Sequence, residues 1–395
     1  MSRHNAAEVV GPATPISGRR LGPKPAAVDG EKAASLSSER RRRTRHPSSP
    51  IAGSLTQVAL LILPDPDLVP SIDDIAAMLT DDVRDACLAE LHAAHPKSTR
   101  VETVLKHALP SRPARAQSRI RFMVETGQPA DPATHDEFFR IGRSKDHAPA
   151  TFILGLFKAL DILRGDLEST PTTLDAGRLQ SLAGAFGKTL ALALGNDGIA
   201  ETFRWKAPKV PATDDYSVRR WVRGHQLFAC LSQGLIFAFQ ALGEADRAAR
   251  PQDVRKAASL IAALLEASAC SLELTGDFPE ALYSQSIRVS MESPFLPTGF
   301  SGLLSDDHRQ LVLRMKLLRP VIERLRDQQH DLHALIFEKL NAVYASHKHV
   351  CARFVGPAQS SLLMSQSSSR SAVEQIERFR QMRVRSWGTP DGSDA

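Results

Sequence analysis

The sequence predicts an all-α protein with a large helical domain, and three observations support this prediction. Most of the chain falls into segments whose apolar residues recur at the i, i+3 and i+4 spacing of a helix. Proline and glycine separate these segments. No run shows the clear alternation of apolar and polar residues that is typical of strands. With 395 residues and 42% hydrophobic content, the chain is long enough to bury a sizeable core.

Each helical segment has its own signals. Residues 71–92 begin with Ser71 ahead of Asp73 and Asp74, which favour a helix N-terminus. Residues 216–242 begin with a charged group, Arg219, Arg220 and Arg223, and then become strongly apolar. We interpret the arginines as a solvated helix start rather than as a binding site for a substrate carboxylate. The other predicted helices span 150–163, 174–194, 254–274, 306–326, 332–354 and a polar, peripheral 372–383.

The two ends of the chain differ from its centre in composition. Residues 1–50 are rich in serine, proline and alanine and include the arginine run 40–43, so we predict a disordered basic tail. Residues 51–386 form the predicted helical domain, and 387–395 form a second disordered tail. The basic tail accounts for most of the formal charge of +6, which leaves the domain near neutrality. No nucleic-acid partner is therefore expected.

Cysteine usage and hydropathy bear on the location of the protein. The chain has four cysteines, Cys87, Cys230, Cys270 and Cys351, and their spacing suggests no disulfide framework. Such usage fits a reducing cytosol. The N-terminal region has no continuous apolar segment like that of a signal peptide, and no run approaches 18 apolar residues. We therefore expect a cytoplasmic protein without a membrane partner.

The most informative stretch is the sequence His-Lys-His-Val-Cys at positions 347–351. On a helix, His347 and Cys351 share a face, about 40° apart around the axis and roughly 6 Å apart along it. An imidazole in this position can bind a heme iron, while the thiol one turn later reaches a vinyl group at the porphyrin edge. His308 begins another helical stretch 39 residues upstream (347 minus 308). These three residues are candidates for a heme site with one thioether bond.

Zinc is the competing interpretation of the same region. His330, His333 and His349 lie near His347 and Cys351 in the sequence, and imidazole and thiolate groups are common zinc ligands. Structural zinc, however, usually takes its ligands from turns and short knuckles, whereas these residues lie on long predicted helices. We interpret His330 and His333 as a hydrophilic junction between helices, and we expect His349 to point away from His347.

The chain combines His308, a spacer of this length and the sequence His-x-x-x-Cys within a predicted all-helical fold. In this combination it resembles a known family. The family is that of the 3-methyl-L-tyrosine hydroxylases of saframycin-type tetrahydroisoquinoline alkaloid biosynthesis. These are heme-dependent peroxygenases in the histidine-ligated aromatic oxygenase group, which includes tryptophan 2,3-dioxygenase. The resemblance covers most of the chain beyond residue 50. It implies an all-α fold that encloses heme, with His308 and His347 as catalytic axial ligands of the iron and Cys351 as the single thioether anchor of a c-type heme.

The resemblance also implies an activity. Hydrogen peroxide would supply the oxygen that converts 3-methyl-L-tyrosine to 3-hydroxy-5-methyl-L-tyrosine in antibiotic biosynthesis. Since two axial imidazoles leave the iron no open position, one is expected to leave during turnover, and His308, at a helix start, is the more easily displaced. Two other functions remain open. They are a bis-histidine heme protein for electron transfer or gas sensing, and an aromatic dioxygenase that uses O2. Related helical enzymes also suggest a homodimer.

Candidate substrate contacts come from the region just before His308. Residues 291–300 contain two prolines and a glycine, which exclude a regular helix and indicate a rigid loop. Phe295 and Phe300 in this loop are predicted to stack on an aromatic substrate ring. Arg288, shortly before the loop, is the candidate partner of a substrate carboxylate.

Overall fold

The computed structural model describes residues 52–106, 131–196, 216–293, 295–296, 300, 302–356 and 371–387. All of them belong to one unit, Ser48–Ala395. The predicted basic tail 1–50 lies outside the described residues, as do residues 388–395. The predicted C-terminal tail starts one residue too early, because Trp387 ends the last helix and is fully buried.

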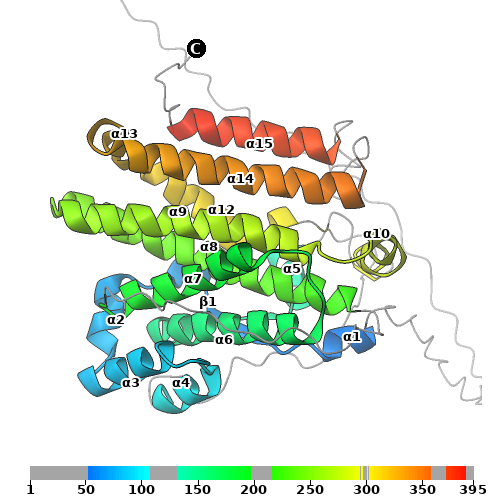
Figure 1. Cartoon of the computed structure of the whole chain (residues 1–395), viewed down its shortest axis with the longest axis horizontal. Coiled ribbons are helices and arrows are strands. Elements are labelled where there is room, and N and C mark those ends of the chain that lie inside the picture. Colours follow the sequence, from blue (N-terminus) through cyan, green and yellow to red (C-terminus); the bar gives the residue numbers. More distant parts are fainter. Residues whose placement is uncertain are drawn as a thin grey trace, which may run out of the picture. The chain divides into compact units, whose positions relative to one another are not determined.

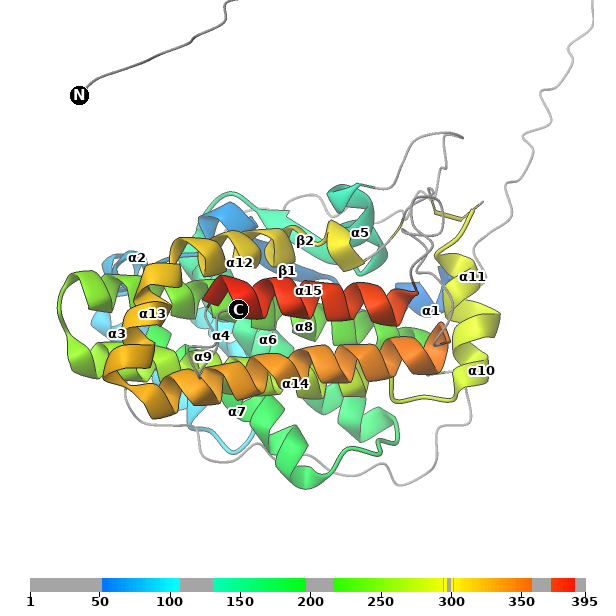
Figure 2. The ribbon, with the colours of Figure 1, turned by 90° about the horizontal axis from the view of Figure 1, so that it is seen from above.

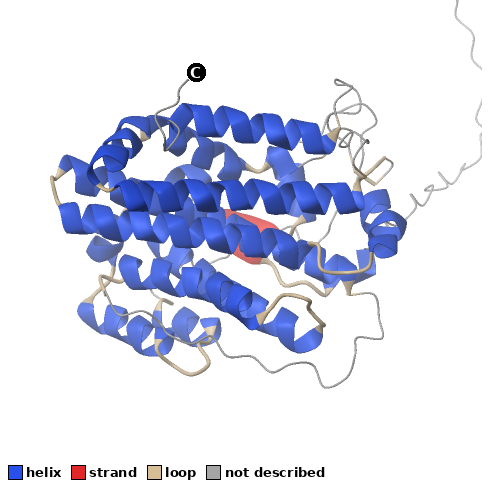
Figure 3. Ribbon diagram, turned by 45° about the horizontal axis from the view of Figure 1, so that its top comes forward, coloured by secondary structure: helices blue, strands red, loops and turns tan. Residues whose placement is uncertain are grey.

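Helices make up most of the described structure, which confirms the all-α prediction (Figure 3). Two four-residue strands, β1 (Leu61–Pro64) and β2 (Ile141–Ser144), pair in parallel in residue-by-residue register. The sequence prediction missed this pair because strands of four residues are too short to show a clear alternation. As described below, the strand pair helps to position the candidate site.

Long helices form the core of the unit in stacked layers (Figure 1). The α8 helix packs extensively against α9, α12 and α6, and α14 packs against α9 and α15. The bounds of the long helices are α6 (Ala148–Ser169), α7 (Ala176–Ala193), α8 (Ser217–Arg247), α9 (Pro251–Thr275), α14 (His330–Phe354) and α15 (Ala372–Trp387).

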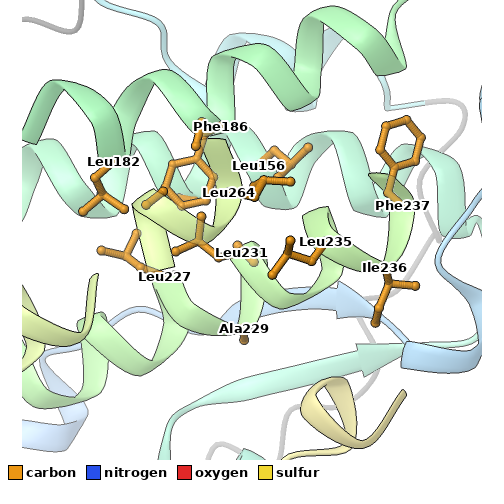
Figure 4. Packing of buried hydrophobic residues seen from close by; sticks show 14 of the residues in the cluster. Leu156, Leu182, Phe186, Leu227, Ala229, Leu231, Leu235, Ile236, Phe237 and Leu264 are labelled. Carbon is orange, nitrogen blue, oxygen red and sulfur yellow. The ribbon is translucent and has the colours of Figure 1, made fainter. Parts of the chain in front are cut away.

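One face of α8 forms the centre of this core (Figure 4). Leu227, Leu231 and Leu235 recur every four residues along it and are almost completely buried. They face Leu182 and Phe186 of α7 in the close-up view. Burial of each such side chain contributes about 1.5–3 kcal/mol to folding, so this face fixes α8 firmly against its neighbours.

The α8 and α9 helices are long and apolar enough to span a membrane by length and composition alone. In this structure, 89% and 72% of their most apolar windows are buried against the rest of the protein. This degree of burial is typical of helices in the core of a folded domain.

Two predicted helices are each divided in two. In the segment 71–92, Ser71 forms a capping box as its sequence suggested, but a second helix starts after Thr80. The segment 306–326 is interrupted just before Pro320, whose ring is disfavoured inside a helix but accepted in a first turn. The resulting helices are α2 (Ile72–Met78), α3 (Asp81–Leu91), α12 (Asp306–Leu317) and α13 (Arg319–Gln328).

The remaining elements are short. They are α1 (Ala52–Thr56), η1 (Pro66–Leu68), α4 (Ser98–Val104), α5 (Pro132–Phe138), α10 (Glu280–Leu282), the π-helical η2 (Tyr283–Ile287), α11 (Arg288–Ser290) and η3 (Gly302–Leu304).

The last helix, α15, is not peripheral, contrary to the prediction. Seen from above, it lies between α12 and α14 and over α8 (Figure 2). Trp387 Nε1 donates a hydrogen bond of 3.0 Å to the Met315 carbonyl of α12. The Trp387 ring also meets Phe239 of α8 and Phe337 of α14, at centroid distances of 5.7 and 6.1 Å. The buried tryptophan therefore holds α15 against three other helices.

Arg220 is a buried charge at the start of α8, so its interpretation as part of a solvated helix start is wrong. Its side chain is 1% exposed. The Nε donates to Asp166 Oδ2 of α6 at 3.0 Å, and Nη1 donates to the Asp277 carbonyl at 2.8 Å. Arg223 also reaches Asp166, at 3.2 Å. These bonds join the ends of α6, α8 and α9.

The α8 helix approaches α9 closely at Gly224. A Cβ on this residue would lie 2.1 Å from Thr275 Oγ1 and 2.9 Å from Thr275 Cα. Because the second of these atoms belongs to the backbone, the helices themselves would have to separate. We expect Gly224→Ala to destabilise the protein by about 1–3 kcal/mol in a urea denaturation experiment.

Gly184 of α7 provides the matched control, because a Cβ there would meet no atom within 4 Å. Gly184→Ala should be neutral or stabilising by up to about 1 kcal/mol, since alanine is the better helix former. Equal effects of the two substitutions would contradict the close packing at Gly224.

Candidate functional site

The N-terminal turn of α12 carries His308 and is held by its own cap. The Ser305 hydroxyl accepts a hydrogen bond from the His308 backbone N–H at 3.4 Å, as the sequence suggested. Asp307 is fully buried, and its carboxylate accepts bonds from Arg143 Nη2 at 2.6 Å and from Gln233 Nε2 at 2.9 Å. The carboxylate thus anchors the helix turn to its neighbours.

Arg143, on β2, joins this turn to the strand pair. Besides Asp307, it binds Asp136 through Nε at 2.7 Å and Nη2 at 3.0 Å. Burial alone would lower the pKa of Arg143, but the neighbouring carboxylates outweigh it and raise the pKa. Gln233 of α8 also donates to the Pro64 carbonyl of β1 at 2.9 Å. The strand pair, α8 and α12 therefore fix the backbone that carries His308.

His308 and His347 lie on different helices, α12 and α14. Burial is the main cause that lowers the pKa of His308 to about 4, and the charges of Arg383 and His347 act in the same direction. Burial also lowers the pKa of His347 to about 4. Both imidazoles are therefore neutral near pH 7, the form in which histidine binds metals.

His347 combines two properties that seldom occur together. More than a third of its surface is accessible, although protein atoms crowd around it closely enough to depress its pKa. Solvent reaches this imidazole, while the surrounding protein disfavours its charged form.

The α15 helix is linked to α14 by polar contacts on this side of the protein. Lys348 Nζ donates to Glu377 Oε2 at 2.6 Å, and Arg380 Nη1 donates to Asn341 Oδ1 at 3.0 Å. Arg383 also hydrogen-bonds Tyr344, and its charge lowers the pKa of His308. Since α15 lies between α12 and α14 (Figure 2), Arg383 brings a positive charge close to both histidine helices.

Cys351 lies one turn after His347 on the same unbroken helix, as predicted. It is half-buried, and burial raises the pKa of its thiol to about 11. The charge of Cys351 also contributes to the raised pKa of Tyr283. Next along α14, the Phe354 ring stacks on Tyr283 at a centroid distance of 4.6 Å. The thiol therefore lies at an aromatic end of the site.

A third histidine, His225 of α8, belongs to the same region and was missed from the sequence. Burial lowers its pKa to about 3, and the charges of His135 and His347 contribute to the shift. Its ring stacks on Phe139 with a centroid distance of 3.8 Å and an interplanar angle of 6°. The available signal was a lone histidine next to a glycine on an otherwise apolar helix, which is weak without the fold.

The three predicted substrate contacts have different environments. Phe300 is 3% exposed and packs against Phe138 and Phe139, so its ring belongs to the aromatic cluster beside His225. Phe295 is half-buried. Arg288 forms an ion pair of 3.0 Å with Glu292, and its charge partly offsets the rise that burial causes in the pKa of Tyr283. Arg288 is therefore near the Cys351 end of the site, but its charge is already paired.

The other histidines of α14 lie away from His347. His349 is exposed and lines a surface hollow of about 400 Å³ together with Asp175, Arg178 and Arg353. His333 is fully buried against Phe337, and neither of its ring nitrogens has a hydrogen-bond partner. The predicted hydrophilic junction is therefore wrong for His333.

The geometry fits heme better than zinc. Over the parts of the chain that the structure describes, no three His, Cys, Asp or Glu side chains are grouped as a metal ion requires. His308 and His347 lie on separate helices, and the Cys351 thiol lies one turn from His347, so the residue types that would hold a porphyrin are present. Aromatic side chains at the Cys351 end suit the apolar edge of the ring.

The comparisons with known proteins agree with this architecture. The family model described as SfmD 3-methyl-L-tyrosine peroxygenase matches residues 63–332, more than half of the chain. The chain belongs to this family. The family match includes His308 and ends before His347 and Cys351, so the second half of the site rests on the structure and the spacing.

A curated member of the family and a solved structure extend the comparison. The chain is 33% identical over 177 residues to a 3-methyl-L-tyrosine peroxygenase from Streptomyces lavendulae, an alignment that covers 45% of this chain. It spans about half (48%) of the length of that relative. A crystal structure of reduced SfmD, soaked with sodium hydrosulfite, has a TM-score of 0.56 at 22% identity, covering 75% of this chain and 99% of that one. The structural similarity establishes a shared fold.

Proposed function

We propose that this protein is a heme-dependent peroxygenase that hydroxylates 3-methyl-L-tyrosine to 3-hydroxy-5-methyl-L-tyrosine with hydrogen peroxide. The observation that carries the proposal is the family match over residues 63–332, which includes His308, and the neutral imidazoles of His308 and His347 accord with it. The name of the curated relative supports the choice of substrate. The product is a catechol of the kind that saframycin-type antibiotic biosynthesis requires.

In this proposal His308 and His347 hold the heme iron, and Cys351 forms a thioether with one vinyl group. Bound heme would supply the oxidising chemistry that transfers an oxygen atom from peroxide to the ring carbon beside the phenol. The protein contributes the surroundings. Burial keeps both imidazoles neutral, and Asp307 holds the turn that carries His308. The positive charge of Arg383 is suited to interact with a heme propionate.

We further propose a cytosolic enzyme, dimeric and without a membrane or nucleic-acid partner. All four cysteines are free, which supports a reducing compartment.

The activity can be tested directly with heme-loaded protein, 3-methyl-L-tyrosine and hydrogen peroxide. We expect a product heavier by one oxygen atom, identified as the catechol by mass spectrometry and NMR. With ¹⁸O-labelled peroxide, the label should enter the product, whereas labelled O2 should not label it. Incorporation from O2 would favour a dioxygenase, and an unreacted substrate beside a redox-active heme would favour an electron-transfer or sensor protein. Either result would contradict the proposal.

The thioether is tested by Cys351→Ala. In the unmodified protein, acid–acetone should leave the heme bound to the polypeptide, whereas in Cys351→Ala it should extract the heme. Cys270→Ala is the matched control, because Cys270 is a buried free thiol on α9 and far along the chain from the proposed anchor. Free extraction of heme from the unmodified protein would disprove the covalent bond.

A further inference from the structure

The His225 ring is held in one orientation. Its Nδ1 lies 2.7 Å from the Trp221 carbonyl oxygen, and a carbonyl only accepts, so Nδ1 must carry the proton of this bond. Phe139 covers one face of the ring at 3.8 Å in a nearly parallel stack. The Trp221 ring lies at 4.6 Å with a tilt of 55°. The polar atom left for another partner is Nε2.

This Nε2 remains available in the described structure. No described residue forms a hydrogen bond with this nitrogen. It also does not belong to the fully buried polar atoms without a hydrogen-bond partner. Both ring nitrogens of His333 do belong to that enclosed group. His225 is half-buried, so part of its surface is accessible.

Three aromatic contacts place His225 relative to Cys351 along the helices. Trp221 of α8 meets Phe354 of α14 at 6.4 Å, while Phe239 and Phe337 both meet Trp387. On α8 the two contact residues, Trp221 and Phe239, are 18 residues apart (239 minus 221). On α14 their counterparts, Phe354 and Phe337, are 17 residues apart in the opposite order (354 minus 337). The two helices therefore run antiparallel, with nearly equal spacing between the contacts.

From this register the position of the third imidazole follows. His225 lies four residues after Trp221, and Cys351 lies three residues before Phe354, so the two occupy the same level. His347 is one turn further along, and its charge contributes to the pKa of His225. His225 therefore lies at the height of Cys351 along the helices, the end of the site where the proposed porphyrin edge would lie.

We infer that His225 determines specificity for a phenol by hydrogen-bonding the substrate hydroxyl through Nε2. The inference rests on the proposed function, because it presumes an aromatic amino-acid substrate. A fixed ring nitrogen satisfies the directional requirement of a phenol O–H, and the neighbouring aromatic rings suit the carbons around it. A substrate without the hydroxyl would leave this nitrogen unpaired in a largely buried site, and its binding would be weaker.

The test compares the binding of two ligands by isothermal titration calorimetry with heme-loaded protein. The ligands are 3-methyl-L-tyrosine and 3-methyl-L-phenylalanine, which lacks only the hydroxyl. The unmodified protein should bind the phenol about tenfold more tightly, the effect of one hydrogen bond in a buried site. His225→Phe, which keeps a planar ring against Phe139, should bind the two ligands within about a factor of two.

Two further variants complete the experiment. His225→Gln offers an acceptor oxygen and should restore part of the preference for the phenol. His349→Phe, an exposed position on the other side of α14, should keep the full preference. Circular dichroism and heme content establish that each variant is folded, and His225→Gln provides the test if His225→Phe does not fold.

The outcomes separate this inference from the proposed function. If the unmodified protein hydroxylates the substrate but His225→Phe and His225→Gln both keep the tenfold preference, the role of His225 is wrong and the function stands. If the preference persists while heme becomes extractable by acid–acetone, His225 acts on the Cys351 bond, and the inference is again overturned. If the unmodified protein neither binds nor converts 3-methyl-L-tyrosine, the proposed function itself is wrong.

Discussion

Replacing Arg220 with leucine should lower the free energy of unfolding by about 3–5 kcal/mol, the usual effect of removing one partner from a buried ion pair. Arg220 is almost completely enclosed and pairs with Asp166, whose side chain is 2% exposed, and with Asp277, whose side chain is 9% exposed. Without the guanidinium, Asp166 Oδ2 would lose its bond from Arg220 Nε and the Asp277 carbonyl would lose its bond from Nη1, while both carboxylates would lose a buried counter-charge. Because the bonds join α6, α8 and α9, the loss should affect the cooperative unfolding of the whole domain.

Chemical denaturation monitored by circular dichroism provides the measurement. The neighbouring Arg219→Leu is the control, because the bond from Arg219 to Gln57 is at the exposed surface. We expect that control to change stability by no more than about 0.5 kcal/mol. Similar effects of the two substitutions would show that the Arg220 cluster is not a special element of the core.

Replacing His347 with alanine should reduce peroxide-dependent hydroxylation by more than about 100-fold. Loss of a group that only supports a metal ligand costs up to about 100-fold, and loss of a ligand itself should cost more. In the proposed site His347 is an axial ligand on the same helix as the thioether anchor. Its loss would leave His308 as the remaining imidazole ligand. The absorption and EPR spectra should change from low-spin to high-spin iron, while the heme stays attached through Cys351.

His349→Ala is the matched control, since this histidine is on the same helix but faces the surface hollow near Arg178. Its spectra and activity should equal those of the unmodified protein. A low-spin, fully active His347→Ala protein would contradict the ligand assignment. A high-spin His349→Ala protein would indicate that His349, and not His347, is the ligand on α14.

The sequence was sufficient for the helical architecture because that information is local. Periodic apolar residues over 174–194 and 254–274 predict helices close to α7 and α9. The short strands depend on pairing between residues 80 positions apart, Leu61 with Ile141, which no local pattern encodes. The burial of Arg220 also had a local signal, because Ser217, Gly224 and Leu227 lie on the same face of α8 and are buried with it. Its carboxylate partners, however, are far away in the sequence.

The candidate site divides in the same way. The shared face of His347 and Cys351 follows from helix geometry, so four residues of sequence are enough to predict it. The positions of His225 and Arg383 depend on how α8 and α15 pack around α12 and α14, and the sequence has no periodic signal for this packing. The anchoring of Asp307 by Arg143 likewise connects residues 164 positions apart.

The pyridine hemochrome spectrum of the purified protein tests the central claim most directly. It reports whether heme is present and, through the position of its α-band, how many vinyl groups have become saturated. We expect a coloured protein whose α-band lies between that of free protoheme and that of a heme with two thioether bonds. A colourless preparation from cells well supplied with iron would contradict the heme site, and a band at the protoheme position would contradict the bond to Cys351.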